Sequence, residues 1–454
     1  EFIPLDLTNE RIKEKIVAAR QSLAVEFPND IDSINKYLEN LDNDYVVYAT
    51  TERIHITYRM YRQMLGREGA QTFVEPFSGS HKVRLTLGIK HEQASDILGE
   101  VFQLIQRYGY QILRSVITRF TEGCESPITV MHFTISNDKE EKIDTESVPM
   151  QKLTKALRTL AWVDNDDFKV FMRDPFNFSI NAVNLLRSMS SWTHISLSKE
   201  NPYYFSEYKI FNTFLHYQEL CGDIVRFFRL KFDPQLAMKL EDRIAEVTKK
   251  SEELTTKINT NVVGDVERRI FFECVKFVKF LTKTNYFIPT KTGLAFRLDT
   301  KILNKDFYKE TPFAFFFVVG RDYRFFQVRW RDISRGGLRV VMPRNSSDYD
   351  SSLASLFDEV YGLSFGQQLK NKDIPEGGSK AVLLLKPGGN RDKAVKGSVN
   401  ALLDLLVAED EAHEEKFSEE VNFYTKEEII YLGPDENITN ELIEWIPRQA
   451  QRRG

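Results

Sequence analysis

The sequence predicts an α/β protein with several domains, and three observations carry this prediction. A chain of 454 residues leaves room for two to four domains, each with a core of its own. Residues 81–137 contain a compact pattern of strand, helix and two further strands. Residues 262–435 alternate between apolar strands and helices, which is typical of an α/β domain with a largely parallel sheet.

The N-terminal part of the chain is expected to be helical and then to form a small sheet. Residues 1–80 are predicted to be mostly helical, although their apolar residues show no clear periodic spacing. The unit at 81–137 is half of a ferredoxin-like fold. It resembles an ACT-type regulatory module, a fold associated with amino-acid sensing, and a purely structural role is the equal alternative. Its expected elements are a strand at 83–88, a helix at 95–108, and strands at 112–120 and 128–135.

The rest of the chain is expected to form a helical connecting region at 138–261, the α/β domain at 262–435 and a short segment at 436–454. Ser346 or Ser347 is a plausible N-cap for a long helix. The expected helices of the α/β domain lie at 266–281, 348–369 and 391–408, and its strands at 293–298, 313–320, 325–331, 381–385 and 427–432.

The composition is that of an ordinary globular protein. Hydrophobic residues make up 42% and charged residues 28% of the chain, and the formal net charge is −4. This charge provides no general attraction to nucleic acid or to anionic membranes, so we expect neither as a partner. The longest apolar runs, such as residues 313–319, are too short to span a bilayer.

The three cysteines, Cys124, Cys221 and Cys274, are widely spaced and odd in number. They fit a reducing compartment and form neither a disulfide framework nor a zinc-binding pattern. We therefore expect no metal site and a cytoplasmic location, with the mitochondrion as the alternative.

The chemistry-bearing residues fall into three clusters at strand ends or turns of the α/β domain. The first, residues 332–339, contains Gly336 and Gly337 between arginines. Paired glycines let a backbone approach a ligand closely, and arginines can fork onto a carboxylate. The third, residues 432–437, has Asp435 directly after a predicted strand. Taken singly, these two clusters are more often a solvated turn and a helix N-cap.

The second cluster gathers lysines next to a predicted core strand. Lys370 and Lys372 precede a Gly-Gly turn that includes Gly378, and Lys380 leads into the apolar residues 381–385. Lysines are seldom gathered beside a core strand unless they face an anion or take part in proton chemistry. A solvated charged loop is the alternative interpretation of this cluster alone.

In this order, the three clusters together resemble the glutamate dehydrogenase superfamily, and within it the large NAD-dependent branch familiar from fungi. The stretches 326–332, 356–359 and 433–437 support the resemblance, which is specific over about residues 262–454. It implies the substrate-binding domain of that superfamily, with NAD bound mainly by a domain absent from this chain. It also implies L-glutamate, 2-oxoglutarate and ammonium as partners and a homo-oligomer, with a tetramer favoured.

The resemblance implies roles for individual residues. Lys380 would activate water for attack on the imino acid intermediate, and Asp435 would carry a proton to and from the substrate nitrogen. Lys370 would bind one substrate carboxylate, and Arg335 would help to hold the other. A lysine activates water near neutral pH only if its pKa is lowered, and burial and the cations Lys370 and Arg335 are the expected causes. The glycines of the substrate-binding set are Gly336, Gly337 and Gly378.

The chain departs from the family pattern in three respects. Small hexameric members carry a lysine where Arg335 lies, and a guanidinium makes a different fork. In the small enzymes the lysine that binds a substrate carboxylate lies farther upstream of the Gly-Gly turn. Either Lys370 or Lys372 could therefore fill that role here. Neither a Gly-x-Gly-x-x-Gly fingerprint nor a Walker-type phosphate loop occurs, and residues 436–454 would begin the segment leading to a Rossmann-type NAD domain.

We therefore expect this chain to be the regulatory and substrate-binding part of an enzyme that oxidatively deaminates L-glutamate with NAD. The chain alone is expected to have no catalytic activity. Two alternatives stay open: a non-enzymatic amino-acid sensor and an oligomerisation scaffold. The presence of Lys370, Lys380 and Asp435 together argues against a decayed site, since decay would tend to remove one of them. A Rossmann-type segment after residue 454 would discriminate an enzyme from a sensor.

Overall fold

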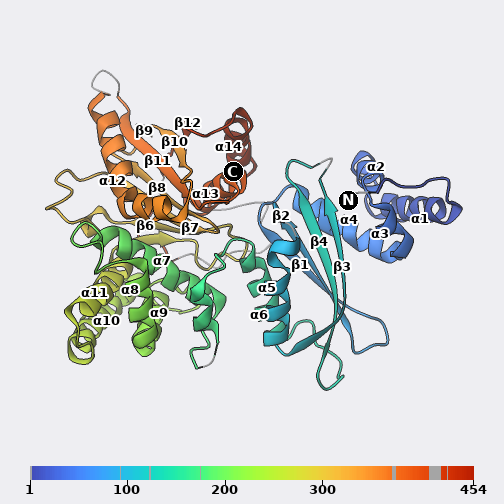
Figure 1. The fold of residues 1–454 in the computed structure, drawn as a ribbon, viewed down its shortest axis with the longest axis horizontal. Helices are drawn as coiled ribbons and strands as arrows, with labels where there is room; N and C mark the ends of the chain where they lie inside the picture. Colours follow the sequence, from blue (N-terminus) through green and yellow to red (C-terminus); the bar gives the residue numbers. More distant parts are fainter. Residues whose placement is uncertain are drawn as a thin grey trace. The chain divides into compact units, whose positions relative to one another are not determined.

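The computed structural model describes residues 3–92, 94–121, 124–173, 175–370, 375–407, 421–426 and 428–453. Contacts divide the chain into two compact units, Glu1–Ala161 and Trp162–Gly454, called unit 1 and unit 2 below (Figure 1). The boundary falls inside the range expected to be a helical connecting region. The finer division of the chain into five parts stays a prediction.

Unit 1 begins with four helices. Asn9, Asp42 and Thr50 each precede a helix, and their side chains accept hydrogen bonds from backbone N–H groups of the first turn. The helices agree with the pattern expected for residues 1–80, and the structure adds a strand, β1, near the end of that range. The helices are α1 (Glu10–Glu26), α2 (Ile31–Glu39), α3 (Asn43–Tyr48) and α4 (Thr51–Leu65).

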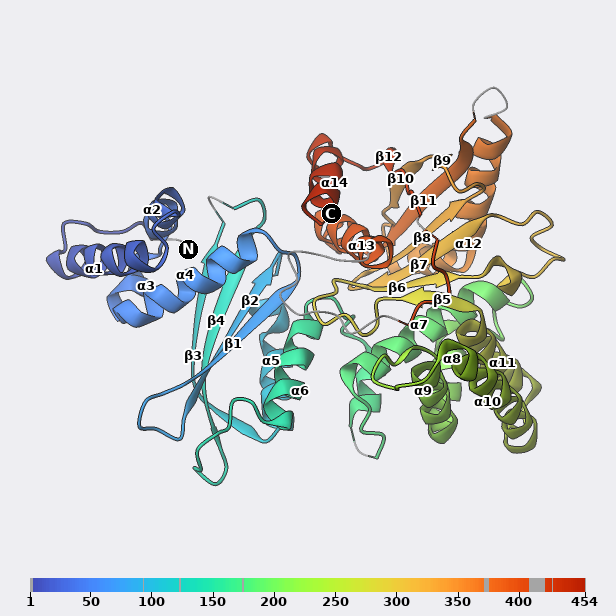
Figure 2. The same ribbon diagram turned by 180° about the vertical axis from the view of Figure 1, so that it is seen from behind.

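The sheet of unit 1 is antiparallel and has the order β1-β2-β4-β3. Helix α5 connects β2 to β3, and β4 pairs between these two strands. Helices α5 and α6 lie on one face of the sheet and α4 on the other (Figure 2). The order strand, helix, strand, strand is confirmed. The elements are β1 (Ala70–Pro76), β2 (Val83–Lys90), α5 (Ala94–Arg107), β3 (Tyr110–Phe120), β4 (Ile128–Asn137) and α6 (Val148–Leu160).

Unit 2 contains a sheet of eight strands with the order β12-β10-β11-β8-β7-β6-β5, and β9 pairs with β11 outside this path. Neighbouring strands from β5 to β11 are antiparallel, and only the pairs of β11 with β9 and β10 and of β10 with β12 are parallel. The strands are β5 (Leu281–Thr284), β6 (Leu294–Leu298), β7 (Ala314–Gly320), β8 (Tyr323–Arg329), β9 (Ser334–Arg335), β10 (Gly337–Val341), β11 (Gly377–Leu385) and β12 (Gly433–Pro434).

The prediction of a largely parallel sheet was therefore wrong. Strands β7 and β8 are joined by only two residues, Arg321 and Asp322, and Asp322 has a positive φ of 64°. Such a short connection joins antiparallel neighbours, whereas parallel strands need a crossover of a dozen or more residues. In unit 2, the helix α12 (Ser346–Lys370) connects the parallel strands β10 and β11.

Helices cover both faces of this sheet (Figures 1 and 2). Helix α12 and the helices α7 to α11 form the larger core on one face, where Trp192 packs against Phe315 and Phe357. Helices α13 (Arg391–Leu406) and α14 (Asn440–Arg452) cover the other face. The helices of the larger layer are α7 (Ile180–Leu197), α8 (Glu207–His216), α9 (Gln218–Phe232), α10 (Leu240–Asn261) and α11 (Asp265–Phe280).

Two further expectations for unit 2 need correction. The side chain of Asn345, instead of Ser346 or Ser347, accepts a hydrogen bond from the Asp348 N–H at the start of α12. The described residues from Glu428 to Leu432 form no strand. The carboxylate of Glu428 is buried in ion pairs with Arg297 and Arg329, so side-chain contacts hold this segment in place of a backbone ladder.

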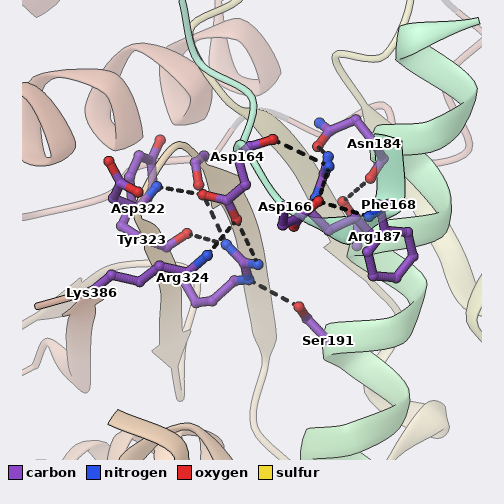
Figure 3. A network of polar contacts seen from close by, with 12 residues as sticks. Asp164, Asp166, Phe168, Asn184, Arg187, Ser191, Asp322, Tyr323, Arg324 and Lys386 are labelled. Atoms are coloured by element: carbon purple, nitrogen blue, oxygen red, sulfur yellow. Dashed lines mark hydrogen bonds and ion pairs between the residues drawn. The ribbon is translucent and has the colours of Figure 1, made fainter. Parts of the chain in front are cut away.

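A buried ionic network lies at the carboxyl-terminal end of β11, opposite the end that carries Lys380. The carboxylate of Asp164 lies between Arg324 of β8 and Lys386 after β11, at 3.0 and 3.1 Å (Figure 3). The same carboxylate accepts a 2.7 Å hydrogen bond from the N–H of Asp322 in the β7–β8 turn. One side chain therefore ties three segments of the sheet to the start of the unit.

We expect Asp164→Asn to destabilise the chain by about 3–5 kcal/mol, because Arg324 and Lys386 would lose their buried counter-charge. Urea unfolding measures this, and the exposed Asp350→Asn is the matched control, with an expected change within about 0.5 kcal/mol. An Asp164→Asn variant as stable as the control would contradict this role.

The pH dependence of this effect follows from the pKa of Asp164. Burial alone would raise the pKa, but the charges of Arg324, Lys386 and Arg187 outweigh burial and lower it below its usual 3.8. A carboxylate with a lowered folded-state pKa stabilises the fold above its unfolded pKa and loses that contribution as the pH falls. The stability difference between wild type and Asp164→Asn should therefore shrink below about pH 4.

Candidate active site

The strand pairings bring the three sequence clusters to one edge of the sheet in unit 2. Arg335 of β9 pairs with Gly378 of β11, and β10 pairs in parallel with β11 from Leu338 onward. Gly337 also pairs with Gly433 of β12, and Asp435 follows β12 directly. The clusters therefore meet at the amino-terminal ends of β10 and β11, whereas open α/β sheets place ligands at carboxyl ends.

Three glycines permit this close approach. A Cβ atom at Gly336 would overlap the carbonyl oxygen of Ser379, and one at Gly378 would overlap the backbone of Gln368 in α12. At Gly337 a Cβ would lie 3.0 Å from the Cβ of Asp435. Side chains at these positions would force the strands or Asp435 apart, which is a packing reason for the glycines.

Lys380 and Asp435 are in contact. The alternation of β11 puts Lys380 on the same face as Val382 and Leu384, which belong to the core that includes α12. The ammonium of Lys380 forms an ion pair with the carboxylate of Asp435, and the two side chains are 13% and 27% exposed. The pair is thus partly screened from water and still reachable by a small molecule.

A ring of charges surrounds this pair. Arg339 of β10 forms ion pairs with Glu359 of α12, at 3.2 Å, and with Glu436, at 3.4 Å. Burial and then the positive charge of Arg339 lower the pKa of Lys380, while Glu359 and Glu436 oppose the shift. A lowered pKa makes the neutral amine more available to accept a proton.

The expected cause of this shift needs correction. Lys370 and Arg335 were predicted to be the neighbouring cations, but the cation that acts on Lys380 is Arg339. Lys370 and Arg335 are exposed, so water screens their charges. The alternation of side chains along β10 could have predicted the position of Arg339. Its neighbours Leu338 and Val340 face the opposite core, so Arg339 faces the other side of the sheet, where Lys380 lies.

The two predicted carboxylate anchors lie on segments that contact Gly378 of β11. Lys370 is the last residue of α12, and the nearby side chain of Gln368 accepts a 2.7 Å hydrogen bond from the N–H of Gly378. Arg335 is held by the backbone pairing of β9 and leaves its side chain in solvent. Lys372, the rival of Lys370, lies outside the described residues.

The described part of the chain offers no group of three or more His, Cys, Asp or Glu side chains arranged to hold a metal ion. Among the same residues, no helix combines the length and the apolar character needed to cross a membrane. The three cysteines are free thiols.

The known proteins that this chain resembles are glutamate dehydrogenases. Glutamate dehydrogenase 2 of Dictyostelium discoideum is 38% identical over 270 residues, which cover 59% of this chain and 25% of that protein. The NAD-specific glutamate dehydrogenase of Neurospora crassa is 27% identical over 453 residues, which cover 91% of this chain and 42% of that protein. The chain is similar to NAD-specific glutamate dehydrogenases over part of their length. The enzyme of that name from Saccharomyces cerevisiae is 39% identical over 215 residues, or 46% of this chain and 19% of the yeast protein.

This similarity confirms the resemblance noted in the sequence. The chain spans less than half the length of the NAD-specific glutamate dehydrogenases that it matches. No family model matches the chain.

Proposed function

We propose that this chain supplies the regulatory and substrate-binding part of an NAD-dependent glutamate dehydrogenase. The reaction is the oxidative deamination of L-glutamate to 2-oxoglutarate and ammonia. The observation that carries the proposal is the contact between Lys380 and Asp435 at a glycine-lined sheet edge, in a chain similar to NAD-specific glutamate dehydrogenases.

The residues of this edge suit the hydrolysis of an imino acid. The neutral amine of Lys380 takes a proton from water, and the oxygen of that water forms a bond to the imino carbon. Lys380 passes that proton to Asp435, which delivers it to the substrate nitrogen. The hydroxyl of the resulting carbinolamine then gives its proton to Lys380 as the carbon–nitrogen bond breaks, so that the ketone forms and ammonia leaves. The ion pair lets the proton gained by Lys380 pass to the carboxylate without bulk water.

Substrate binding needs two cationic anchors, because glutamate carries two carboxylates. Lys370 at the end of α12 is proposed to hold one carboxylate, and Arg335 of β9 the other. Gly336, Gly337 and Gly378 would let the substrate approach the backbone closely.

The names of the Neurospora crassa and Saccharomyces cerevisiae relatives specify NAD, and we propose NAD as the cofactor of the whole protein. The described residues do not fit a dinucleotide: no glycine-rich fingerprint follows a strand, and no sequence of that kind occurs in the chain. No residue is therefore assigned to NAD. We further propose an ACT-like regulatory role for residues 81–137 of unit 1, a cytoplasmic location and a homo-oligomer, with a tetramer favoured.

The test of the function is NAD reduction by the full-length protein with L-glutamate as substrate. We expect steady NADH formation, and release of 2-oxoglutarate and ammonia in equal amounts. A full-length protein that binds L-glutamate without reducing NAD would overturn the proposal in favour of an amino-acid sensor.

Lys370→Ala in that protein should raise the KM for L-glutamate about 10-fold or more with little change in kcat. The reason is that a lysine holding a substrate carboxylate contributes binding in the ground state as well as in the transition state. Steady-state kinetics measure the split, and the exposed Lys309→Ala is the control with unchanged constants. A fall in kcat at constant KM would show that Lys370 is no anchor.

A further inference from the structure

The chain just before β12 is held in place by a buried carboxylate. The side chain of Glu428 is 1% exposed, and it forms ion pairs with Arg297 of β6, at 2.8 Å, and with Arg329 of β8. Glu428 lies in neither a helix nor a strand, so its side chain supplies the fixation that a backbone ladder would otherwise give. Removing one partner of a buried ion pair leaves the other charge uncompensated, which makes this anchor strong.

Arg329 holds the same segment at a second point. Its Nη1 atom donates a 2.8 Å hydrogen bond to the carbonyl oxygen of Ile429, while its Nη2 atom contacts the Glu428 carboxylate. The Cζ atom of the guanidinium lies 5.2 and 5.8 Å from the ring centroids of Phe313 and Phe316. A guanidinium is a planar fork whose donors have fixed directions, so one side chain sets the positions of two consecutive residues.

The backbone of Arg329 also lies beside Lys380. Strands β8 and β11 pair in antiparallel fashion, with Arg329 opposite Ser379 and Val328 opposite Lys380. Both strands lie inside the sheet and have a neighbour on each side. Arg329 is therefore connected to both partners of the candidate site. It reaches Lys380 through the backbone ladder, and it reaches the segment before Asp435 through its guanidinium.

Residues 429–434 connect Glu428 to Asp435. Before β12 these residues form no strand. Ile430 and Leu432 pack against the core that α13 and α14 cover, so side chains hold the path of the segment. The position of Asp435 therefore depends on where Glu428 is held.

Asp435 has a second anchor on its other side. The side-chain amide of Asn437 donates a 2.8 Å hydrogen bond to the carbonyl oxygen of Val340 in β10. The N–H of Val340 in turn donates a 3.0 Å hydrogen bond to the carbonyl oxygen of Glu436. This anchor consists of hydrogen bonds between neutral groups, whereas the anchor at Glu428 depends on charge. A substitution that removes the Glu428 charge should therefore release one side of Asp435 and leave the other in place.

We propose that Glu428 and Arg329 are positioning residues of the candidate active site, which set the distance between its base and its proton carrier. They act through β8 and through residues 429–434, and neither is assigned a chemical step. The roles of Lys380 and Asp435 come from the proposed function, on which this inference rests. The contact between their side chains can be measured without turnover.

The pKa of Lys380 reports on this contact. The charged groups that face Lys380 are Asp435, Arg339, Glu359 and Glu436. A nearby carboxylate favours the ammonium form, so moving Asp435 away should lower the pKa of Lys380 further while the other three groups stay in place. The neutral amine would then form at lower pH, although proton transfer to Asp435 would be slower.

Acetic anhydride labelling of the full-length protein over a range of pH, followed by mass spectrometry, measures this pKa. The reagent acylates the neutral amine, so the labelling rate of Lys380 gives its apparent pKa. We expect Glu428→Gln to move the labelling of Lys380 to lower pH.

The NADH assay gives a second readout on the same variant. Glu428→Gln should lower kcat about 10- to 100-fold, because small displacements of reacting groups are costly, and change the KM for L-glutamate by less than about threefold. The rising limb of kcat against pH should move in the same direction as the labelling.

Glu273→Gln is the matched control, because Glu273 is another buried carboxylate of unit 2. Its side chain accepts hydrogen bonds from Trp192 and Ser196, at 3.0 and 2.8 Å, and it belongs to α11 instead of the candidate site. We expect Glu273→Gln to lower stability in urea while kcat and the labelling of Lys380 stay unchanged.

Glu428→Asp keeps the charge but is one methylene shorter, so it should shift the labelling of Lys380 in the same direction by a smaller amount. It carries the test if the glutamine variant does not fold. The proposal is overturned if Lys380 in the folded Glu428 variants is labelled as in wild type, or if Glu273→Gln shifts the labelling equally. A wild-type protein that does not reduce NAD with L-glutamate would overturn the proposed function alone, since the labelling still decides whether Glu428 positions Asp435.

Discussion

Lys380→Ala in the full-length protein is expected to abolish measurable turnover of L-glutamate while the fold stays intact. The side chain is 13% exposed and contacts Asp435 instead of an apolar core, so its loss removes charge chemistry more than packing. General acid–base groups contribute about 10²- to 10⁴-fold, which a routine NADH assay resolves. Urea unfolding checks the fold, and Lys309→Ala controls for loss of a lysine. Turnover above about a tenth of wild type would exclude Lys380 as the base.

The pH profile gives a second reading of the same residue. Because the neutral amine is the reactive form, kcat should rise as the pH passes upward through the pKa of Lys380. Arg339 lowers that pKa, so Arg339→Gln should move the rising limb to higher pH. A limb that stays in place would mean that another group titrates there.

Asp435→Asn should lower kcat by about 10²- to 10⁴-fold with little change in the KM for L-glutamate. The amide keeps the size of the side chain beside Gly337 but can no longer carry the proton. Losing the carboxylate also removes a partner that favours the ammonium form of Lys380, so any residual activity should have its rising limb at lower pH.

The control for this change is Asp350→Asn, an exposed aspartate of α12. A large rise in KM for Asp435→Asn at constant kcat would assign the residue to substrate binding and contradict a role in proton transfer.

Most of the element order could be predicted from the sequence, because apolar periods differ between helices and strands. Pairing direction could not, since an apolar run such as residues 314–320 looks the same in parallel and antiparallel sheets. The β7–β8 turn uses Arg321 and Asp322, which lack the Asn-Gly or Asp-Gly signal of a hairpin. The predicted strand at 427–432 is an error of another kind, because the described residues of this segment form no strand. Its Ile429 and Tyr431 are 61% and 52% exposed, and the buried Glu428 holds the segment.

The candidate site was predictable where glycines and charges stand next to strands. Gly336, Gly337, Lys380 and Asp435 were singled out in this way and lie close together, and their roles stay predictions. Arg339 was missed as the neighbour of Lys380, because the pairing of β10 with β11 brings it there and nearness in sequence does not.

The strand that precedes Asp435 is short. β12 pairs through only Gly433 and Pro434, at the outer edge of the sheet. Lys380 lies in the nine-residue β11, which has neighbours on both sides. Detaching β12 and the residues after it would break the hydrogen bonds that Gly433, Glu436 and Asn437 make with β10 and Gly336, which are fewer than those along β11. Local opening can therefore separate the two partners without unfolding of the domain. Amide hydrogen exchange should therefore be fast at Gly433 and slow along Val382–Leu384. The distance between Lys380, the base, and Asp435, the proton carrier, would then change each time this segment opens.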